Sequence, residues 1–215
     1  MKQTPEELLA RAYALSDAAE AKALYRDWAT TYDATMLGGL GYLTPSRTAD
    51  LLAGNLAERD ASILDVGCGT GLAGEALAGR GFLDIDALDY SPEMLKVAGA
   101  RLHEGQRVYN RLIEADLNAP LDLANDSYDA LICTGTFTHA HVGAACLDEL
   151  FRILKPGGLF ACTVHKDVWQ PAGFAEKVAE LEKSGRLETL AHEPGTYFAD
   201  SAEPDGFYIL WRSGQ

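Results

Sequence analysis

The sequence has 215 residues, the size of a single domain. Apolar residues make up 47% of the chain and charged residues 23%, a mixture that supplies a sizeable core and excludes a disordered or fibrous protein. Because 32 acidic residues outnumber 18 basic ones, the net charge of −14 repels nucleic acid phosphates and anionic membrane surfaces. We therefore predict neither nucleic acid nor a membrane as a partner, and expect a small-molecule ligand.

The cysteines and the N-terminal residues indicate a reducing compartment. None of the four cysteines belongs to a CxxC pair, and three lie inside apolar runs, where a reduced thiol behaves as a small hydrophobic group. The first 28 residues carry acidic side chains where a targeting leader would carry a basic region. No stretch approaches the roughly 18 consecutive apolar residues of a membrane span. We expect a cytoplasmic protein.

The first 60 residues are expected to form a helical lid. Residues 4–7 read TPEE, a capping pattern that starts a first helix. A second helix is predicted over 17–33 from its apolar face at helical spacing. The segment 37–45 is rich in Gly and Pro and is expected to be a loop, and a third helix is predicted over 46–56.

From residue 61 onward, short apolar runs of strand length alternate with helical stretches, which is the pattern of βαβ units. The expected strands are 63–66, 85–88, 111–114, 128–133, 158–164, 186–191 and 207–212. The expected helices are 72–78, 92–102, 142–154 and 172–184. Because no helix separates the last two strands, they should pair as an antiparallel hairpin on an otherwise parallel sheet. Residues 61–215 would form the core of one domain that includes the lid.

One buried strand candidate runs directly into three alternating glycines, in the segment Ile63-Leu64-Asp65-Val66-Gly67-Cys68-Gly69-Thr70-Gly71. A loop without side chains lets a ligand lie against bare backbone, and the helix that follows directs free N–H groups at it. Asp89 comes eighteen residues after Gly71, at the end of the next strand candidate. A carboxylate there can accept hydrogen bonds from both ribose hydroxyls of a nucleoside. These features predict a nucleoside pocket.

Residues 69–74 also fit GxGxxG, the pattern of dinucleotide-binding loops, so an NAD-dependent oxidoreductase is an alternative. Asp65 lies two residues before the first glycine, where a carboxylate repels a pyrophosphate and can hold an ammonium group. The pattern therefore favours a ligand with a cationic amino-acid tail.

Four motifs follow one another within residues 60–165: LDVGCGTG, ALDYSPEML, Ala115-Asp116-Leu117 and LKPGG. In these motifs the chain resembles the class I S-adenosylmethionine-dependent methyltransferases, and more narrowly the small type 11 or Williams-Beuren-region-like methyltransferases. The resemblance implies a Rossmann-like α/β fold whose seven strands lie in the order 3-2-1-4-5-7-6, with the last strand antiparallel. It also implies S-adenosylmethionine as the cofactor and S-adenosylhomocysteine as the product.

The resemblance assigns cofactor-binding roles by position. The glycine loop and the end of the fourth strand would hold the methionine part of the cofactor, and the acid after the second strand its ribose. The residues after that acid, with the third motif, would hold the adenine. The residues implied in this way are Tyr32, Asp65, Gly67, Cys68, Gly69, Gly71, Asp89, Tyr90, Ser91, Met94, Ala115, Asp116, Leu117, Thr134 and Gly135.

The segment after the fourth strand is expected to face the methyl acceptor, since ligands of such sheets bind beyond the carboxyl ends of the strands. His139 and His141 are the catalytic candidates, because an imidazole can take a proton at neutral pH. Both also fit a plain capping or solvent-facing role. No metal site is predicted, because an HxH pair alone does not define one. The candidate substrate residues are Trp28, Tyr42, Arg47 and Phe137.

The expected reaction is transfer of a methyl group to an O, N or S atom of a small molecule by direct in-line displacement. Such a displacement needs alignment and exclusion of water, and no covalent intermediate. Two alternatives stay open, the oxidoreductase named above and a non-catalytic module that binds the cofactor without turnover. The sequence does not indicate an oligomeric state.

Overall fold

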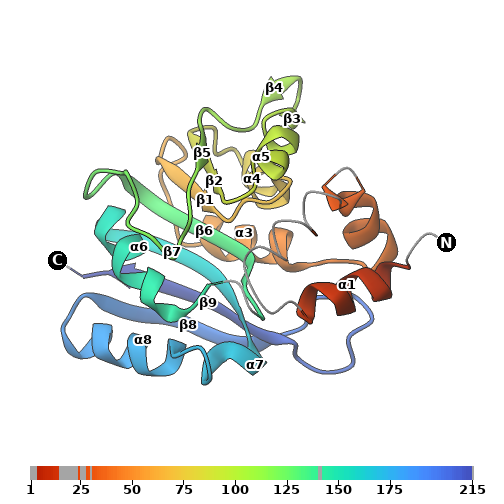
Figure 1. The fold of residues 1–215 in the computed structure, drawn as a ribbon. Coiled ribbons are helices and arrows are strands. Elements are labelled where there is room, and N and C mark those ends of the chain that lie inside the picture. Colours follow the sequence, from red (N-terminus) through yellow and green to blue (C-terminus); the bar gives the residue numbers. More distant parts are fainter. Residues whose placement is uncertain (1–3, 15–23, 25–27, 30, 140–141, 215) are drawn as a thin grey trace.

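The computed structural model describes residues 4–14, 24, 28–29, 31–139 and 142–214. Within them, seven strands form one sheet in the order β5-β2-β1-β6-β7-β9-β8, with helices on both faces (Figure 1). The strands are β1 Ile63–Val66, β2 Ile85–Asp89, β5 Leu112–Glu114, β6 Tyr128–Phe137, β7 Leu154–His165, β8 Leu187–Gly195 and β9 Gly206–Ser213. A separate small hairpin consists of β3 Leu102–His103 and β4 Gln106–Arg107.

This strand order confirms the predicted topology. Counted along the chain without the small hairpin, the strands of the sheet lie in the order 3-2-1-4-5-7-6. β1 pairs in parallel with β2 and β6, whereas β9 runs antiparallel to both of its neighbours, β7 and β8. The strand order reverses beside β1, and ligands of such sheets bind at the carboxyl ends next to this reversal. The fold therefore brings the ends of β1, β2 and β6 together.

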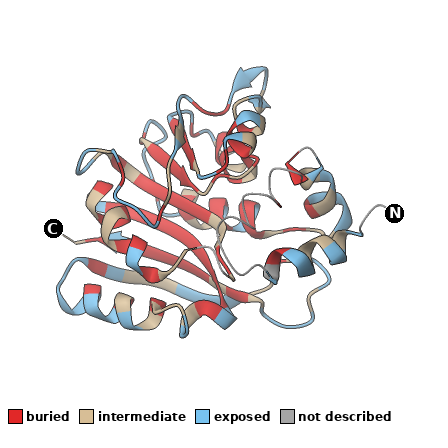
Figure 2. Cartoon of the chain, in the orientation of Figure 1, coloured by how far each residue is buried: buried red, intermediate tan, exposed pale blue. Residues whose placement is uncertain are grey.

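The helices are α1 Pro5–Tyr13, α3 Thr44–Ala53, α4 Leu72–Ala78, α5 Pro92–Ala98, α6 Leu147–Ile153, α7 Lys166–Trp169 and α8 Phe174–Lys183, with a π-helical segment η1 Ala34–Gly39 and a 3-10 turn η2 Ala144–Cys146. The later helices cover the sheet, whereas α1 packs on the segment η1 of the lid. α8 is typical: it buries Phe174, Val178 and Leu181, which lie on one face at helical spacing. Its remaining faces are largely exposed (Figure 2).

Side chains of the central strands alternate between two apolar cores. On β1, Leu64 and Val66 belong to one core and Ile63 to the other; on β6, Leu131 and Ile132 divide in the same way. All five side chains are fully buried. A strand that is apolar on both faces reads in the sequence as an unbroken hydrophobic run, which is why these strands were predictable.

α3 packs into the core and does not belong to the lid. Its Ala49 and Leu52 are fully buried in the same cluster as Ile63 and Leu159. A third cluster joins lid residues to the β8–β9 hairpin; its buried members are Ala12, Leu24, Trp28, Met36, Tyr42, Tyr197 and Tyr208. The lid that we propose therefore ends before Thr44 and not at residue 60.

Some predicted element boundaries are wrong, for identifiable reasons. The expected loop 37–45 is partly helical, because η1 continues through Gly39 and α3 begins at Thr44. β7 is longer than predicted, since it starts at Leu154 and pairs there with Tyr128, across a register shift in the ladder. The predicted helix over 17–33 lies mostly outside the described residues.

Phe137 corrects one sequence-based expectation. We expected it near the methyl acceptor, but its side chain is fully buried in the core. Its ring packs against Phe174 at a centroid distance of 5.0 Å and against Phe160 at 6.4 Å. The strand alternation explains the error, because Phe137 is the last residue of β6 and points into the face covered by α8.

The described helices include none that is long and apolar enough to cross a membrane. All four cysteines are buried and free of disulfides.

Candidate functional site

A pocket opens at the carboxyl ends of β1, β2 and β6, where the fold predicts a ligand. The glycine loop forms one wall, the segments after β2 and β5 another, and the end of β6 with two lid tyrosines the rest. The lining residues are Tyr32, Tyr42, Pro45, Gly67, Cys68, Gly69, Thr70, Leu72, Ala73, Leu88, Asp89, Tyr90, Ser91, Met94, Ala115, Asp116, Leu117, Asn118, Thr134, Gly135, Thr136 and Val142.

The glycine loop presents bare backbone to this pocket. Gly69 has a φ of 53°, and a Cβ at this position would meet no atom within 4 Å, so the open space beside it is pocket. Gly67 needs its glycine for another reason: a Cβ there would overlap Thr136 on β6. The loop is held from behind, since Cys68 N donates to Leu88 O at 2.9 Å. A ligand can therefore approach the loop more closely than side chains would allow.

Asp89 faces the pocket at the end of β2. Its Oδ2 accepts from Gly69 N and its Oδ1 from Ser91 N, both at 2.8 Å. Burial raises the pKa of Asp89, and these backbone hydrogen bonds oppose the rise. A carboxylate has about four lone-pair sites, so these backbone contacts leave Asp89 room to accept from a ligand hydroxyl. The geometry suits recognition of a ribose diol.

Asp65 does not line the pocket, contrary to the sequence-based expectation. It is 1% exposed and its Oδ2 accepts from Tyr109 Oη at 2.6 Å and from Gly74 N at 3.1 Å. Its Oδ1 is buried and has no hydrogen-bond partner among the described residues. Burial raises its pKa to about 7, although the bonds from Tyr109 and Gly74 act against the rise. Asp65 thus supports the corner between β1 and α4 from behind the loop.

This environment predicts a pH-dependent effect of Asp65→Asn on stability. Because folding raises the pKa of Asp65, its stabilising contribution is complete below about pH 4 and is lost as the pH rises through about 7. The free energy of unfolding of Asp65→Asn relative to the wild type should therefore shift in favour of the variant between pH 5 and pH 8. Urea unfolding of both proteins at several pH values measures this difference. A difference independent of pH contradicts the buried, partly protonated carboxyl.

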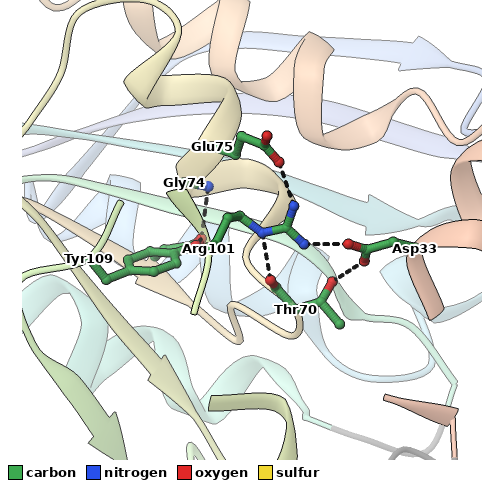
Figure 3. A network of polar contacts seen from close by, with 7 residues as sticks. Asp33, Thr70, Gly74, Glu75, Arg101 and Tyr109 are labelled. Atoms are coloured by element: carbon green, nitrogen blue, oxygen red, sulfur yellow. Dashed lines mark hydrogen bonds and ion pairs between the residues drawn. The ribbon is translucent and has the colours of Figure 1, made fainter. Parts of the chain in front are cut away.

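Arg101 joins three parts of the chain next to the pocket (Figure 3). Its side chain is 13% exposed; Nε donates to Thr70 O at 2.8 Å, Nη1 to Glu75 on α4 at 2.5 Å and Nη2 to Asp33 at 2.5 Å. Asp33 also accepts from Thr70 Oγ1. Burial lowers the pKa of Arg101, but its bonds and charge interactions with Asp33 and Glu75 outweigh this and raise it. The guanidinium therefore ties the lid to the glycine loop.

We predict that Arg101→Met weakens binding of S-adenosylmethionine, the cofactor expected from the sequence, by about one order of magnitude, the scale of one charge-assisted hydrogen bond. The lid and Thr70 lose their shared partner, while no pocket-lining side chain is removed. Calorimetric titration measures the affinity. Arg80→Met is the matched control, because Arg80 links α3 to α4 through Asp50 and Ser46 without reaching the pocket. Equal affinities of wild type and Arg101→Met would contradict the link.

The lid contributes tyrosines to the pocket and anchors them from behind. Tyr32 lines the pocket, and Trp28 packs edge-on against it at 4.8 Å. Trp28 is 3% exposed, does not line the pocket and donates from Nε1 to Thr35 Oγ1 at 3.3 Å. The expectation that Trp28 faces a substrate is therefore wrong, because it lies in the lid core. Tyr42 lines the pocket, with its hydroxyl against Gly135.

Arg47, a candidate substrate residue in the sequence analysis, does not face the pocket. Its Nη1 donates to the carbonyl and the hydroxyl of Thr196, both at 3.1 Å, and it does not line the pocket. Nearby, Tyr42 forms a β-bridge with Phe198, and Leu43 N donates to Tyr197 O at 2.8 Å. Arg47 thus helps to fasten the end of the lid to the loop between β8 and β9.

Beyond the end of β6, His139 packs against His165. Thr136 and Val142 both line the pocket, and His139 lies between them in the chain. His139 itself does not line the pocket; its Nε2 lies 3.5 Å from Asp167 Oδ2, and its ring packs against His165 at 4.9 Å. His141 lies outside the described residues. The candidate base thus follows the pocket wall in the chain but does not itself line the pocket.

The pocket brings together most of the residues predicted to bind a cofactor. All of them line it except Asp65 and Gly71; Gly71 instead caps α4 and packs against Tyr109. The sequence analysis missed Arg101, Tyr109 and Asp167. Arg101 and Asp167 come from segments without a motif, so only their contacts identify them.

These residues fit S-adenosylmethionine. Gly69 faces open space, Asp89 directs both oxygens at the pocket edge, and Met94 and Leu117 supply apolar surface for a base. The site therefore has a polar end for a sugar and a side-chain-free wall for an amino-acid tail.

Comparison with known proteins gives consistent matches. A family model described as a methyltransferase domain matches residues 64–162. Human methyltransferase-like protein 27 is 32% identical over 192 residues, which cover 85% of this chain and 74% of that protein. The ubiquinone biosynthesis O-methyltransferase of Xanthomonas campestris is 36% identical over 149 residues, 67% of this chain; the chain spans 59% of the length of that enzyme.

A solved structure shares the fold. It is a chain from the complex between the Haloferax volcanii Trm112 methyltransferase activator and a methyltransferase, with a TM-score of 0.63 at 20% identity. The alignment covers 94% of this chain and 99% of that one.

Proposed function

Because the chain belongs to the class I S-adenosylmethionine-dependent methyltransferases, we propose that it methylates an O, N or S atom of a small molecule. The observation that carries the proposal is the pairing of Gly69, whose missing side chain leaves the pocket wall open, with the Asp89 carboxylate at the end of β2, which accepts from Gly69 N. When bound, the cofactor supplies an electrophilic methyl group on a sulfonium. The protein's own task is then to bind, align and exclude water.

We propose that different parts of the pocket wall bind the ribose and the adenine of the cofactor. Asp89 would accept hydrogen bonds from the ribose hydroxyls. Met94 and Leu117, which are 3% and 8% exposed, would enclose the adenine ring, with Tyr90 at its outer edge. Asp116 would accept from the exocyclic amine; its Oδ1 already accepts from Asn118 N and so is held in place. Ser91 and Ala115 complete this part of the wall.

The methionine part would lie along Gly67, Cys68 and Gly69, opposite Thr134 and Gly135. Asp65, behind the loop, would act on its ammonium group only indirectly, through the backbone that it supports. Tyr32 closes the site from the lid, and an aromatic ring there suits a cationic sulfonium.

A small acceptor is favoured by the electrostatics and by one relative. The net charge of −14 disfavours nucleic acid, and the Xanthomonas relative is an O-methyltransferase of ubiquinone biosynthesis. We infer an acceptor that binds beside Tyr42 and the end of β6, which both line the pocket. A cytoplasmic location stays a prediction and agrees with four free, buried cysteines.

We propose His139 as the catalytic base, with His141 as the sequence-based second candidate. The Asp167 carboxylate, 3.5 Å from His139 Nε2, would stabilise the imidazolium that forms when His139 takes the acceptor's proton. No nucleophile is needed, because the methyl group passes directly to the acceptor atom.

The cofactor part of this proposal is tested by calorimetric titration with S-adenosylmethionine, S-adenosylhomocysteine and NAD. We expect micromolar binding of the first two, weakened by at least about tenfold in Asp89→Ala, since two ligand hydrogen bonds to a charged group are lost. Asp60→Ala, an exposed acid away from the pocket, is the control. Binding of NAD alone would favour the dinucleotide alternative and overturn the proposal.

The catalytic part is tested by transfer of a labelled methyl group to a panel of phenols, amines and thiols. His139→Gln should lower the rate by about 10²- to 10⁴-fold, the usual contribution of a general base, without changing the affinity for the cofactor. If the wild type binds the cofactor but methylates no member of a broad panel, the non-catalytic module becomes the better interpretation. An active His139→Gln would remove His139 from the mechanism.

A further inference from the structure

Three potential metal ligands meet beside the proposed acceptor site. His139 follows β6, His165 is the last residue of β7, and Asp167 lies in the first turn of α7. Because β6 and β7 are parallel neighbours, their carboxyl ends bring these residues together although 26 positions separate the two histidines. One ligand atom of each residue lies within 4.8 Å of the other two.

Two of the distances in this cluster exceed the usual length of a hydrogen bond and lie near the spacing of ligands around a shared ion, and the third lies within 4.8 Å. Asp167 Oδ2 lies 3.5 Å from His139 Nε2 and 3.7 Å from His165 Nδ1, whereas hydrogen bonds to oxygen measure about 2.7–3.2 Å. Ligands that bind zinc at about 2.0–2.2 Å in a tetrahedron stand roughly 3.3–3.5 Å apart. A small inward movement of the side chains would therefore complete the coordination.

The state of His165 favours a ligand. Its side chain is 7% exposed, and its Nδ1 accepts a hydrogen bond of 3.3 Å from Asp167 N, so the nitrogen that faces the carboxylate carries the lone pair. An ion bound there would replace this hydrogen bond. Metals bind an imidazole through such a nitrogen lone pair. The ammonium group of Lys166 does not pair with the Asp167 carboxylate, because its Nζ donates to Pro204 O at 2.9 Å.

The ligand set selects the class of ion. Two imidazoles and one carboxylate suit zinc and other divalent transition ions, whereas magnesium and calcium prefer oxygen ligands. Asp167 is 57% exposed, so an ion can enter from solvent, and the acidic protein attracts cations.

We propose that His139, His165 and Asp167 bind a divalent transition-metal ion, and that this ion and the methyl acceptor compete for Nε2 of His139. The second half rests on the proposed function: the lone pair that would take the acceptor's proton is the one that an ion would occupy. Metal binding would thus switch off the base without touching the cofactor pocket.

Titration of the tag-free chain, treated first with EDTA, with zinc chloride in a calorimeter tests the site. We expect one zinc ion per chain, and binding at least about tenfold weaker in Asp167→Asn and in His165→Gln, since each removes a ligand. Zinc should also raise the melting temperature of the wild type more than that of either variant. The controls Asp60→Asn and His103→Gln change residues of the same types outside the cluster. Absence of saturable binding, or variants that bind as the wild type does, would overturn the site.

The competition is tested separately. Zinc should lower the rate of methyl transfer, EDTA should restore it, and S-adenosylmethionine affinity should stay the same. The remaining activity of Asp167→Asn should require at least about tenfold more zinc for the same inhibition. Stimulation by zinc would overturn the competition and the role of His139 as a free base. Failure to find any acceptor would count against the proposed function alone, because zinc binding is measured without turnover.

Discussion

The passage from β1 into α4 is the constraint on which the site depends. Here the backbone must turn sharply while leaving room for a ligand, and Gly67, Gly69 and Gly71 all have positive φ values. The loop is held by two hydrogen bonds from its backbone to β2, which are accepted by Leu88 O and the Asp89 carboxylate. The same carboxylate that fixes the loop therefore also faces the ligand, so loop shape and sugar recognition depend on one side chain.

Around this loop, polar groups are arranged in two layers. Asp89 and the backbone of Gly69 face the pocket, whereas Asp65 and Tyr109 lie behind it, buried and hydrogen-bonded to each other. The inner layer is costly, because a buried carboxylate loses its hydration, and the raised pKa of Asp65 expresses this cost. An acid next to a glycine loop can thus serve the loop itself and need not touch the ligand.

The two sides of the pocket are closed by different kinds of interaction. On the lid side, the guanidinium of Arg101 holds Asp33 and Thr70 by charge-assisted bonds (Figure 3). On the acceptor side, the lid is fastened to the β8–β9 loop by a β-bridge and by aromatic packing of Tyr42 on Phe198. The Arg101 contacts depend on charge, whereas the contacts of Tyr42 depend on backbone pairing and apolar packing. A substitution can therefore weaken one set without the other.

The sequence by itself determined the class of fold through local signals, and it indicated the strand order and most of the pocket wall through motifs that resemble those of a known family. Apolar runs mark strands buried on both faces, and alternating glycines with an acid after the next strand mark a nucleoside pocket. Only the tertiary structure decided which way a side chain points. Phe137 directly follows the pocket residue Thr136 but faces the core, because neighbouring residues of a strand point to opposite faces. Asp65 lies two residues before the pocket residue Gly67, but its carboxylate bonds to Tyr109 behind the loop. Arg101 and Asp167 acquire their partners from distant segments, and no local pattern records contacts that form only when the sheet brings those segments together.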